Sequence, residues 1–271
     1  MKALIPAAGY GTRFLPATKA TPKEMLPIGC RPALQWLVEE ALEAGADEVI
    51  IVTSPGKASI REYFTPDPLL IEKARGKPEI MAELERLDAI TPRIRFAEQR
   101  EQLGLGHAIL QAADLVGTEC DKVLILLGDA LVSGVPCCSR EIIEVSAKYC
   151  DASIVGLEKV PAERVSRYGI VAGEQALDNE RVWSISGIIE KPVPEQAPSN
   201  LAIAGRYLLD RKIFELLADQ RPGVGREIQL TDAIVRLLSC TPVYGYCYPG
   251  RRHDIGNPAG YLEALRAFVP V

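Results

Sequence analysis

A chain of 271 residues with 48% hydrophobic and 25% charged residues has the composition of a soluble globular protein. Its formal net charge is −5 and it contains no long basic run, which argues against a nucleic-acid-binding protein. No segment approaches the roughly 20 apolar residues that span a bilayer, and no apolar stretch follows a basic start. We therefore expect neither a membrane protein nor a signal peptide.

The seven cysteines bear on the cellular compartment. Their spacing is irregular, Cys137 and Cys138 are adjacent, and no C-x-x-C pair occurs. This pattern favours reduced thiols in a cytoplasmic protein over a disulfide framework. The two histidines offer no paired ligand spacing, so we expect no zinc site.

The first half of the chain alternates apolar strands with amphipathic helices, which predicts an α/β fold with a parallel or mixed sheet covered on both faces. Residues 65–92 carry four prolines and a helix around 80–87, and we interpret them as an insertion near the substrate cleft or at a subunit contact. The other expected elements are a strand opening at Leu4, a helix at 32–44 closed by Gly45, a strand at 48–53, a helix at 57–64, a strand at 93–97, a helix at 108–115, a strand at 123–127 and a helix at 138–149.

The pattern changes after Asp151, where polar turns separate short strands. No linker rich in Pro, Gly or Ser divides the two halves, which favours one shared mixed sheet. The expected elements are strands at 153–158, 169–172, 182–190 and 201–209 and helices at 212–218, 231–238 and 258–268.

The most informative segment is the run L-I-P-A-A-G-Y-G-T-R-F-L-P-A-T-K-A-T-P-K-E-M-L-P at 4–27. Its glycines let the backbone approach a ligand closely, and successive N–H groups in such a turn form an anion site. Arg13, Lys19 and Lys23 add positive charge around the turn. The combination suits a triphosphate that releases pyrophosphate.

Two common phosphate-binding motifs are excluded for this segment. A Walker A loop needs G-x-x-x-x-G-K-[ST], which the chain lacks. The dinucleotide-binding fingerprint needs a third glycine or alanine, but Phe14 occupies that position after Gly9 and Gly11.

The 4–27 segment resembles the opening motif of the sugar-1-phosphate nucleotidylyltransferases, and most closely that of the bacterial members that use UTP and glucose 1-phosphate. Further matching motifs follow in order along nearly the whole chain. They are Q-R-E-Q-L-G-L-G-H-A at 99–108, L-G-D at 127–129, R-Y-G at 167–169, I-E-K-P at 189–192, A-P-S-N-L-A-I-A-G-R-Y at 197–207, E-I-Q-L-T-D-A at 227–233 and G-R-R-H-D-I-G at 250–256.

The resemblance implies a Rossmann-like three-layer α/β fold with a mixed, mostly parallel central sheet. It implies a single nucleotidyltransferase domain over 1–271, with a nucleotide-binding portion at 1–150 and a sugar-binding portion with C-terminal helices at 151–271. The implied reaction joins UTP and α-D-glucose 1-phosphate into UDP-glucose and pyrophosphate with Mg²⁺, and the implied assembly is a homo-oligomer, either a dimer or a tetramer. Such a reaction relies on positioning and electrostatics.

The resemblance also assigns residues on the nucleotide side. Arg13 and Lys23 would be catalytic and stabilise charge on the triphosphate. The implied nucleotide-binding residues are Ala8, Gly9, Gly11, Thr12, Gln99 and Gly104. Two residues stay open: Lys19 is either functional or structural, and Glu24 has an orienting role or is an ordinary exposed glutamate.

Asp129 and Asp254 are the implied Mg²⁺ ligands. Asp129 follows the apolar run 123–127 and so lies at the carboxyl end of a central strand, where open α/β sheets bind ligands. Two carboxylates suffice for Mg²⁺ when phosphates and water complete the shell. The alternatives are a turn residue for Asp129 and a cap of the final helix for Asp254.

On the sugar side, the resemblance implies binding by Gly169, Glu190, Lys191 and Gly205, with Arg206 in the same wall. Adjacent strand residues point to opposite faces, so Glu190 and Lys191 can share one ligand only if the strand ends or bulges there. His107 is not needed as a base, because the attacking phosphate is already anionic. We expect His107 to start a helix after Gly106.

Two other functions remain open from sequence. The same fold could use dTTP, CTP or another sugar phosphate. A catalytically weak regulatory paralogue is the second alternative, although the charged residues named above are all present.

Overall fold

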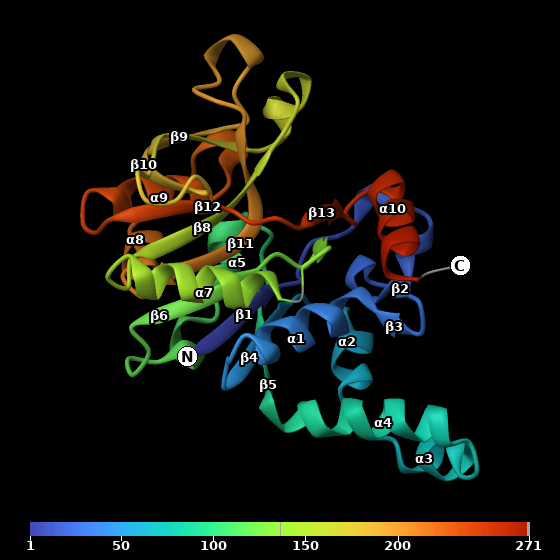
Figure 1. Cartoon of the computed structure of the whole chain (residues 1–271). Coiled ribbons are helices and arrows are strands. Elements are labelled where there is room, and N and C mark those ends of the chain that lie inside the picture. The colour runs from blue at the N-terminus through green and yellow to red at the C-terminus, as the bar shows by residue number, and fades with distance from the viewer. Residues whose placement is uncertain (136, 270–271) are drawn as a thin grey trace.

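The computed structural model describes residues 1–135 and 137–269, and it is an α/β structure built on one large sheet (Figure 1). Among the described residues this sheet has nine strands. They are β1 (Lys2–Pro6), β4 (Glu48–Thr53), β5 (Ile94–Glu98), β6 (Lys122–Leu126), β8 (Ser153–Lys159), β9 (Gly169–Gln175), β10 (Val182–Glu190), β11 (Leu201–Asp210) and β12 (Val243–Cys247).

The strand order is β5-β4-β1-β6-β11-β8-β12-β10-β9. Neighbours from β5 to β6 are parallel, whereas β11 runs antiparallel to both β6 and β8. β12 is parallel to β8, and β10 is antiparallel to β12 and β9. The sheet is mixed, as predicted, but the expectation that it is mostly parallel is wrong: among the described residues four of its strand pairs are parallel and five are antiparallel. The antiparallel pairs all involve β10 or β11, in the second half of the chain.

Two small ribbons accompany the main sheet. β2 (Pro27–Ile28) pairs with β3 (Arg31–Pro32), and β7 (Ala130–Ser133) pairs with β13 (Arg251–Asp254). The second ribbon joins the segment after β6 to the C-terminal segment.

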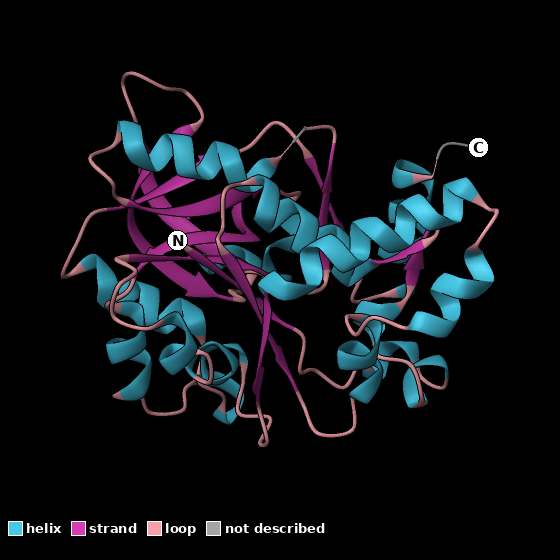
Figure 2. Cartoon of the chain, turned by 90° about the horizontal axis from the view of Figure 1, so that it is seen from below, coloured by secondary structure: helices cyan, strands magenta, loops and turns pink. Residues whose placement is uncertain are grey.

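The helices are α1 (Ala33–Glu43), α2 (Ala58–Tyr63), α3 (Pro68–Ala74), α4 (Pro78–Ile90), α5 (Leu105–Leu110), α6 (Ala113–Val116), α7 (Cys138–Lys148), α8 (Ile213–Ala218), α9 (Leu230–Leu238) and α10 (Pro258–Phe268). Figure 2 shows helices on both sides of the strands. Alternation along β1 explains these layers, because successive side chains point to opposite faces. Ala3 and Ile5 pack with α1 and α7, whereas Leu4 packs with α5, α8 and α9. The predicted three-layer fold is confirmed.

The predicted helix at 108–115 is wrong in its bounds. Its place is taken by α5 and α6, and Gln111 and Ala112 separate them. The start moves to Leu105 because Gly104 adopts a φ of +101° and Gly106 N donates to Ile228 O at 2.8 Å. His107 therefore lies inside the first turn of α5 and does not start the helix.

The predicted insertion at 65–92 contains two helices, α3 and α4, where sequence patterning predicted one. Asp67 caps α3, since its carboxylate accepts from the N–H groups of Leu69 and Leu70, and Pro68 occupies the first helical position. The two helices protrude from the body of the molecule at the lower right of Figure 1. No residue of α4 is buried.

Candidate functional site

Two adjoining cavities lie beyond the carboxyl ends of β1 and β6. The first has a volume of about 400 Å³ and is lined by the loop after β1, by Lys23 and Glu24, and by the segment from Gln99 to Ala108. The second, of about 140 Å³, lies between β9, β10, β11 and the start of α9. Both are bordered by Leu105, Leu127 and Asp129. Asp129 therefore lies where a ligand filling the first cavity would meet one in the second.

The glycine turn after β1 forms one wall of the first cavity, which Ala8 and Gly9 line. Gly11 lies behind them with a φ of +64°, and a Cβ there would come within 3.3 Å of both Lys23 Cβ and Thr18 Cγ2. Glycine is therefore required for the turn to pack against Lys23.

The next two predicted residues, Thr12 and Arg13, are exposed in a short 3-10 helix and do not line either cavity. Lys19 is also exposed and outside both cavities.

Lys23 and Asp129 form the closest ion pair of the site, with Nζ 2.5 Å from Oδ2. Burial lowers the pKa of Lys23, but Asp129 and Glu24 raise it further, so its pKa lies above the ordinary value. Burial raises the pKa of Asp129, yet Lys23 lowers it further, and the carboxyl stays ionised. The ammonium thus sits beside the acidic junction of the two cavities.

Asp254 joins Asp129 through the β7–β13 ribbon, in which Ala130 is paired with Asp254. A Cβ built on Gly256 would lie 3.0 Å from Asp129 Oδ2 and 3.0 Å from Asp254 Oδ1. Both carboxylates therefore border the same small space, which stays open because residue 256 has no side chain.

Asp254 does not cap the final helix, so that alternative is wrong. The cap of α10 is Asn257, whose side chain accepts from Gly260 N at 3.0 Å. No group of three or more His, Cys, Asp or Glu side chains suited to a metal occurs within 1–135 and 137–269. A hard cation that takes two carboxylates together with ligand phosphates fits this pair.

Gln99 and Gly104 lie together on the far side of the first cavity. Gln99 is 2% exposed, and its Nε2 donates to Gly104 O at 3.1 Å. A Cβ on Gly104 would come within 2.8 Å of Glu227 Cβ and 2.9 Å of Ile228 O. The loop from β5 to α5 is thus held against the 227–229 segment.

Glu24 is not an exposed glutamate, so that alternative is wrong: the residue is 1% exposed. Its Oε2 accepts from Lys57 Nζ at 2.9 Å, and the same ammonium donates to Ala7 O at 2.6 Å. Burial raises the pKa of Glu24 and lowers that of Lys57. The pair ties the base of the glycine turn to the segment that carries Lys23. Sequence reasoning missed Lys57, which has no motif of its own.

Gly169, Glu190 and Gly205 line the second cavity. A Cβ on Gly169 would lie 3.1 Å from Glu190 Oε2, and Gly205 has a φ of +81°. β10 ends at Glu190, and Lys191 adopts a φ of +47°. β10 thus ends between Glu190 and Lys191, which is the condition set above for both side chains to reach one ligand. Lys191 Nζ comes within 3.5 Å of Glu190 Oε1, although Lys191 itself is half exposed and does not line the cavity.

Arg206 does not belong to this wall, and that expectation is wrong. Its side chain is fully buried on the other face of β11, where its guanidinium pairs with both carboxylate oxygens of Glu40 at 2.8–2.9 Å. Alternation along β11 accounts for this direction, because Arg206 lies on the face of Ala204 and Leu208. Gly205, its neighbour in the chain, lies on the opposite face, which lines the cavity.

Arg252 is a residue of the second cavity that sequence reasoning missed. Its Nε donates to Glu158 Oε1 at 2.6 Å, and its guanidinium lies 4.5 Å from the centroid of the Tyr168 ring. The signal was available, because Arg252 is two residues from Asp254 and so shares a face of β13.

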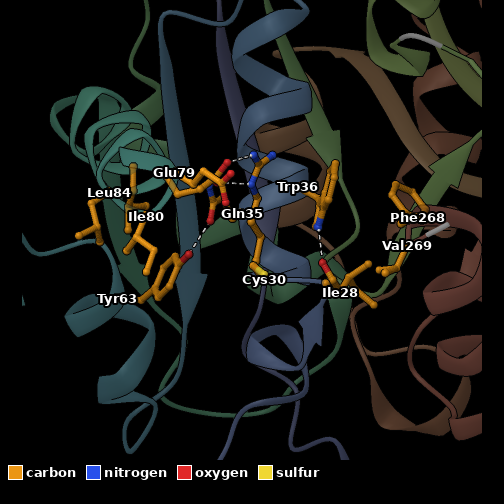
Figure 3. Close-up of a pocket in the computed structure, with 14 residues that line it drawn as sticks. Ile28, Cys30, Gln35, Trp36, Tyr63, Glu79, Ile80, Leu84, Phe268 and Val269 are labelled. Atoms are coloured by element: carbon orange, nitrogen blue, oxygen red, sulfur yellow. Dashed lines mark hydrogen bonds and ion pairs between the residues drawn. The ribbon is translucent and has the colours of Figure 1, made fainter. Parts of the chain in front are cut away.

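A larger cavity, of about 720 Å³, lies elsewhere and shares no lining residue with these two. Figure 3 shows it between Trp36 of α1, Ile80 and Leu84 of α4, and Phe268 at the end of α10. No residue of 65–92 lines either cavity of the site, so the insertion is not part of this cleft.

Comparisons with known proteins agree with this geometry. The family model described as nucleotidyl transferase matches residues 2–269, so the chain belongs to the nucleotidyl transferase family. It is 40% identical over 270 residues to a UTP–glucose-1-phosphate uridylyltransferase of Bacillus subtilis, covering 99% of this chain and 90% of that relative. An enzyme of the same name from Pseudomonas aeruginosa is 42% identical, with 97% and 94% covered.

Solved structures give the same result. A UDP-glucose pyrophosphorylase complexed with UDP-glucose is 39% identical, with a TM-score of 0.86 and coverage of 98% of this chain and 97% of that one. The UTP-bound UGPase from Acinetobacter baumannii is 38% identical, with a TM-score of 0.87 and coverage of 97% and 91%. The family resemblance seen in the sequence is confirmed. Within the described residues, no helix is long and apolar enough to cross a membrane.

Proposed function

We propose that this protein transfers the uridylyl group of UTP to α-D-glucose 1-phosphate, giving UDP-glucose and pyrophosphate. The observation that carries the proposal is the pair of adjoining cavities that meet at Asp129. Relatives about 40% identical over nearly the whole chain bear the name of this activity, and the related structures hold UTP or UDP-glucose.

In the proposed reaction, an oxygen of glucose 1-phosphate attacks the α-phosphorus in line. A P–O bond forms there as the bond to the β-phosphate oxygen breaks and pyrophosphate leaves. The nucleophile is already anionic, so no general base is required. The protein brings the two substrates together and opposes the charge that builds on the phosphates. Lys23, which pairs with Asp129, and Arg13, which is exposed after the glycine turn, would supply that positive charge.

Mg²⁺ is the proposed cofactor, held by Asp129 and Asp254 with ligand phosphates. The two carboxylates border one open space beside Gly256, and carboxylate oxygens suit this hard cation. The ion would neutralise phosphate charge and bring the two substrates together. Lys23, which pairs with Asp129, would lie beside the same phosphates and oppose their charge.

The remaining residues are proposed to bind the two substrates. Backbone groups of Ala8, Gly9, Gly11 and Thr12 would meet the nucleotide, and Gln99 with Gly104 would read the base. Glu190 would accept hydrogen bonds from the glucose hydroxyls beside the bare backbone of Gly169 and Gly205. Lys191 would bind the sugar phosphate. We further propose that 1–271 is one domain, its nucleotide-binding portion at 1–150 and its sugar-binding portion at 151–271.

A cytoplasmic homo-oligomer, dimer or tetramer, is part of the same proposal. Seven free cysteines suit a reducing compartment. The apolar lining of the 720 Å³ cavity and the exposed Leu69, Leu70 and Ile80 of α3 and α4 offer surface for contact between copies. Light scattering on the purified protein would measure the oligomeric state, and a monomer at all concentrations would reject this part.

The deciding experiment is pyrophosphate release with Mg²⁺ and glucose 1-phosphate against UTP, dTTP, CTP and ATP. A strong preference for UTP supports the proposal. Faster turnover with dTTP or CTP would keep the chemistry and reject the base assignment. Absence of turnover with every pair would favour the regulatory paralogue.

A further inference from the structure

The orientation of the Gln99 side-chain amide is determined by its neighbours. Gly104 O, 3.1 Å away, is a carbonyl oxygen and can only accept, so the group facing it must be the NH₂ of Gln99. This assignment does not depend on distinguishing amide nitrogen from oxygen by position, because one orientation alone forms the hydrogen bond.

His107 uses the second hydrogen of this NH₂. Its Nδ1 lies 3.0 Å from Gln99 Nε2, and the histidine is in the first turn of α5. Since Gln99 is the donor, Nδ1 must be unprotonated and the ring hydrogen must be on Nε2. The amide of Gln111, 3.1 Å from His107 Nε2, then turns its oxygen to that N–H and gives up the longer 3.4 Å contact to His107 O.

Both hydrogens of the Gln99 amide are thus used inside the protein. Its Oε1 has no hydrogen-bond partner among the described residues, and Gln99 lines the 400 Å³ cavity. The side-chain group that Gln99 leaves available to a ligand in this cavity is therefore an acceptor. Uracil and thymine carry an N3–H that matches such an acceptor, whereas N3 of cytosine is itself an acceptor and opposes it.

We propose that His107 is a positioning residue that locks the Gln99 amide with its oxygen toward the base, and so selects nucleotides with an N3–H over cytidine nucleotides. The inference rests on the proposed function and adds the origin of its base selectivity. His107 itself does not touch the substrate. Without His107, the Gln99 amide gains a second orientation, in which its NH₂ can donate a hydrogen bond to N3 of cytosine.

The test compares kcat/KM for UTP, dTTP and CTP in the full-length protein and two variants. His107→Leu removes the ring acceptor, and His107→Asn keeps an acceptor near the position of Nδ1. We expect the UTP-to-CTP ratio of kcat/KM to fall about tenfold in His107→Leu, because the Gln99 amide is then free to turn its NH₂ toward the base. The ratio should be restored in His107→Asn. The UTP-to-dTTP ratio should stay constant, because both bases present the same edge.

An unchanged UTP-to-CTP ratio in His107→Leu would overturn the inference, even if kcat/KM falls equally for all nucleotides, because that result marks a merely structural residue. Equal shifts in both ratios would also overturn it. Calorimetric binding of UTP and CTP gives the same ratio for a variant that binds but does not turn over. Absence of UTP turnover or binding in the unmodified protein would instead reject the proposed function.

Discussion

Lys23 Nζ lies 2.5 Å from Asp129 Oδ2, although 106 residues separate the two in the chain. This ion pair links the segment after the glycine turn, which lines the first cavity, to the carboxyl end of β6, where the two cavities adjoin. Positive charge is thus already beside the carboxylate before any ligand arrives. A metal held by Asp129 and Asp254 would lie beside Lys23, so the ammonium and the metal would both oppose the charge of bound phosphates.

Asp129→Asn tests whether this carboxylate holds the metal. We expect kcat to fall by roughly 100-fold, because the loss of a metal ligand removes charge stabilisation from the reacting phosphates. The Mg²⁺ concentration for half-maximal activity should rise as well. Steady-state rates across a Mg²⁺ titration measure both. Asp114→Asn, which changes an exposed carboxylate on α6, is the matched control. A wild-type titration for Asp129→Asn would mean that Asp129 is only a turn residue.

Lys191→Ala tests the sugar-phosphate assignment. Loss of one charge-assisted hydrogen bond should raise KM for glucose 1-phosphate about tenfold and leave KM for UTP close to wild type. Lys159→Ala removes another exposed lysine at the end of β8 and should change neither. Equal effects of the two substitutions would argue that Lys191 acts through general surface charge.

Local patterns in the sequence predicted most of the sheet: 48–53, an apolar run, and 182–190, which is rich in β-branched residues, match β4 and β10 to the residue. The unpredicted β7 and β13 are only four residues long and exist through mutual pairing, which no local pattern encodes. The same limit applies to side chains. Asp129 follows an apolar strand and could be singled out, whereas the ion pair of Glu24 with Lys57 joins side chains 33 residues apart in the chain.

Gly104→Ala probes the packing of the base-side loop. A Cβ at this position meets Glu227 Cβ and Ile228 O within 3 Å, and the backbone φ of +101° disfavours any side chain. We expect a loss of at least about 2 kcal/mol in the free energy of unfolding, together with a higher KM for UTP. Gly187→Ala, where a Cβ would enter open space at an ordinary φ, is the control. Denaturant titration and kinetics measure the two effects, and equal stability of both variants would contradict the argument.

Glu40→Gln tests the buried pair that holds α1 to β11. Burial alone would raise the pKa of Glu40, but Arg206 and Ser139 lower it further, so the folded-state pKa lies below the ordinary value of 4.5. A carboxyl with a lowered folded pKa contributes its full stabilisation above the unfolded pKa and loses it as pH falls through the folded value. The substitution should therefore cost about 3 kcal/mol at pH 7, since it leaves Arg206 buried without a charged partner, and the cost should shrink below about pH 4.5.

Denaturant unfolding of wild type and variant between pH 7 and pH 4 measures that difference. Glu43→Gln on the same helix is the control, because Glu43 pairs with Arg140 at the exposed surface and should change stability by less than about 0.5 kcal/mol. A Glu40→Gln penalty that is independent of pH would assign the effect to side-chain packing. A penalty that shrinks as the pH falls assigns it to the charge of Glu40, and the wall that carries Gly205 would then depend on an ion pair on the opposite face of its strand.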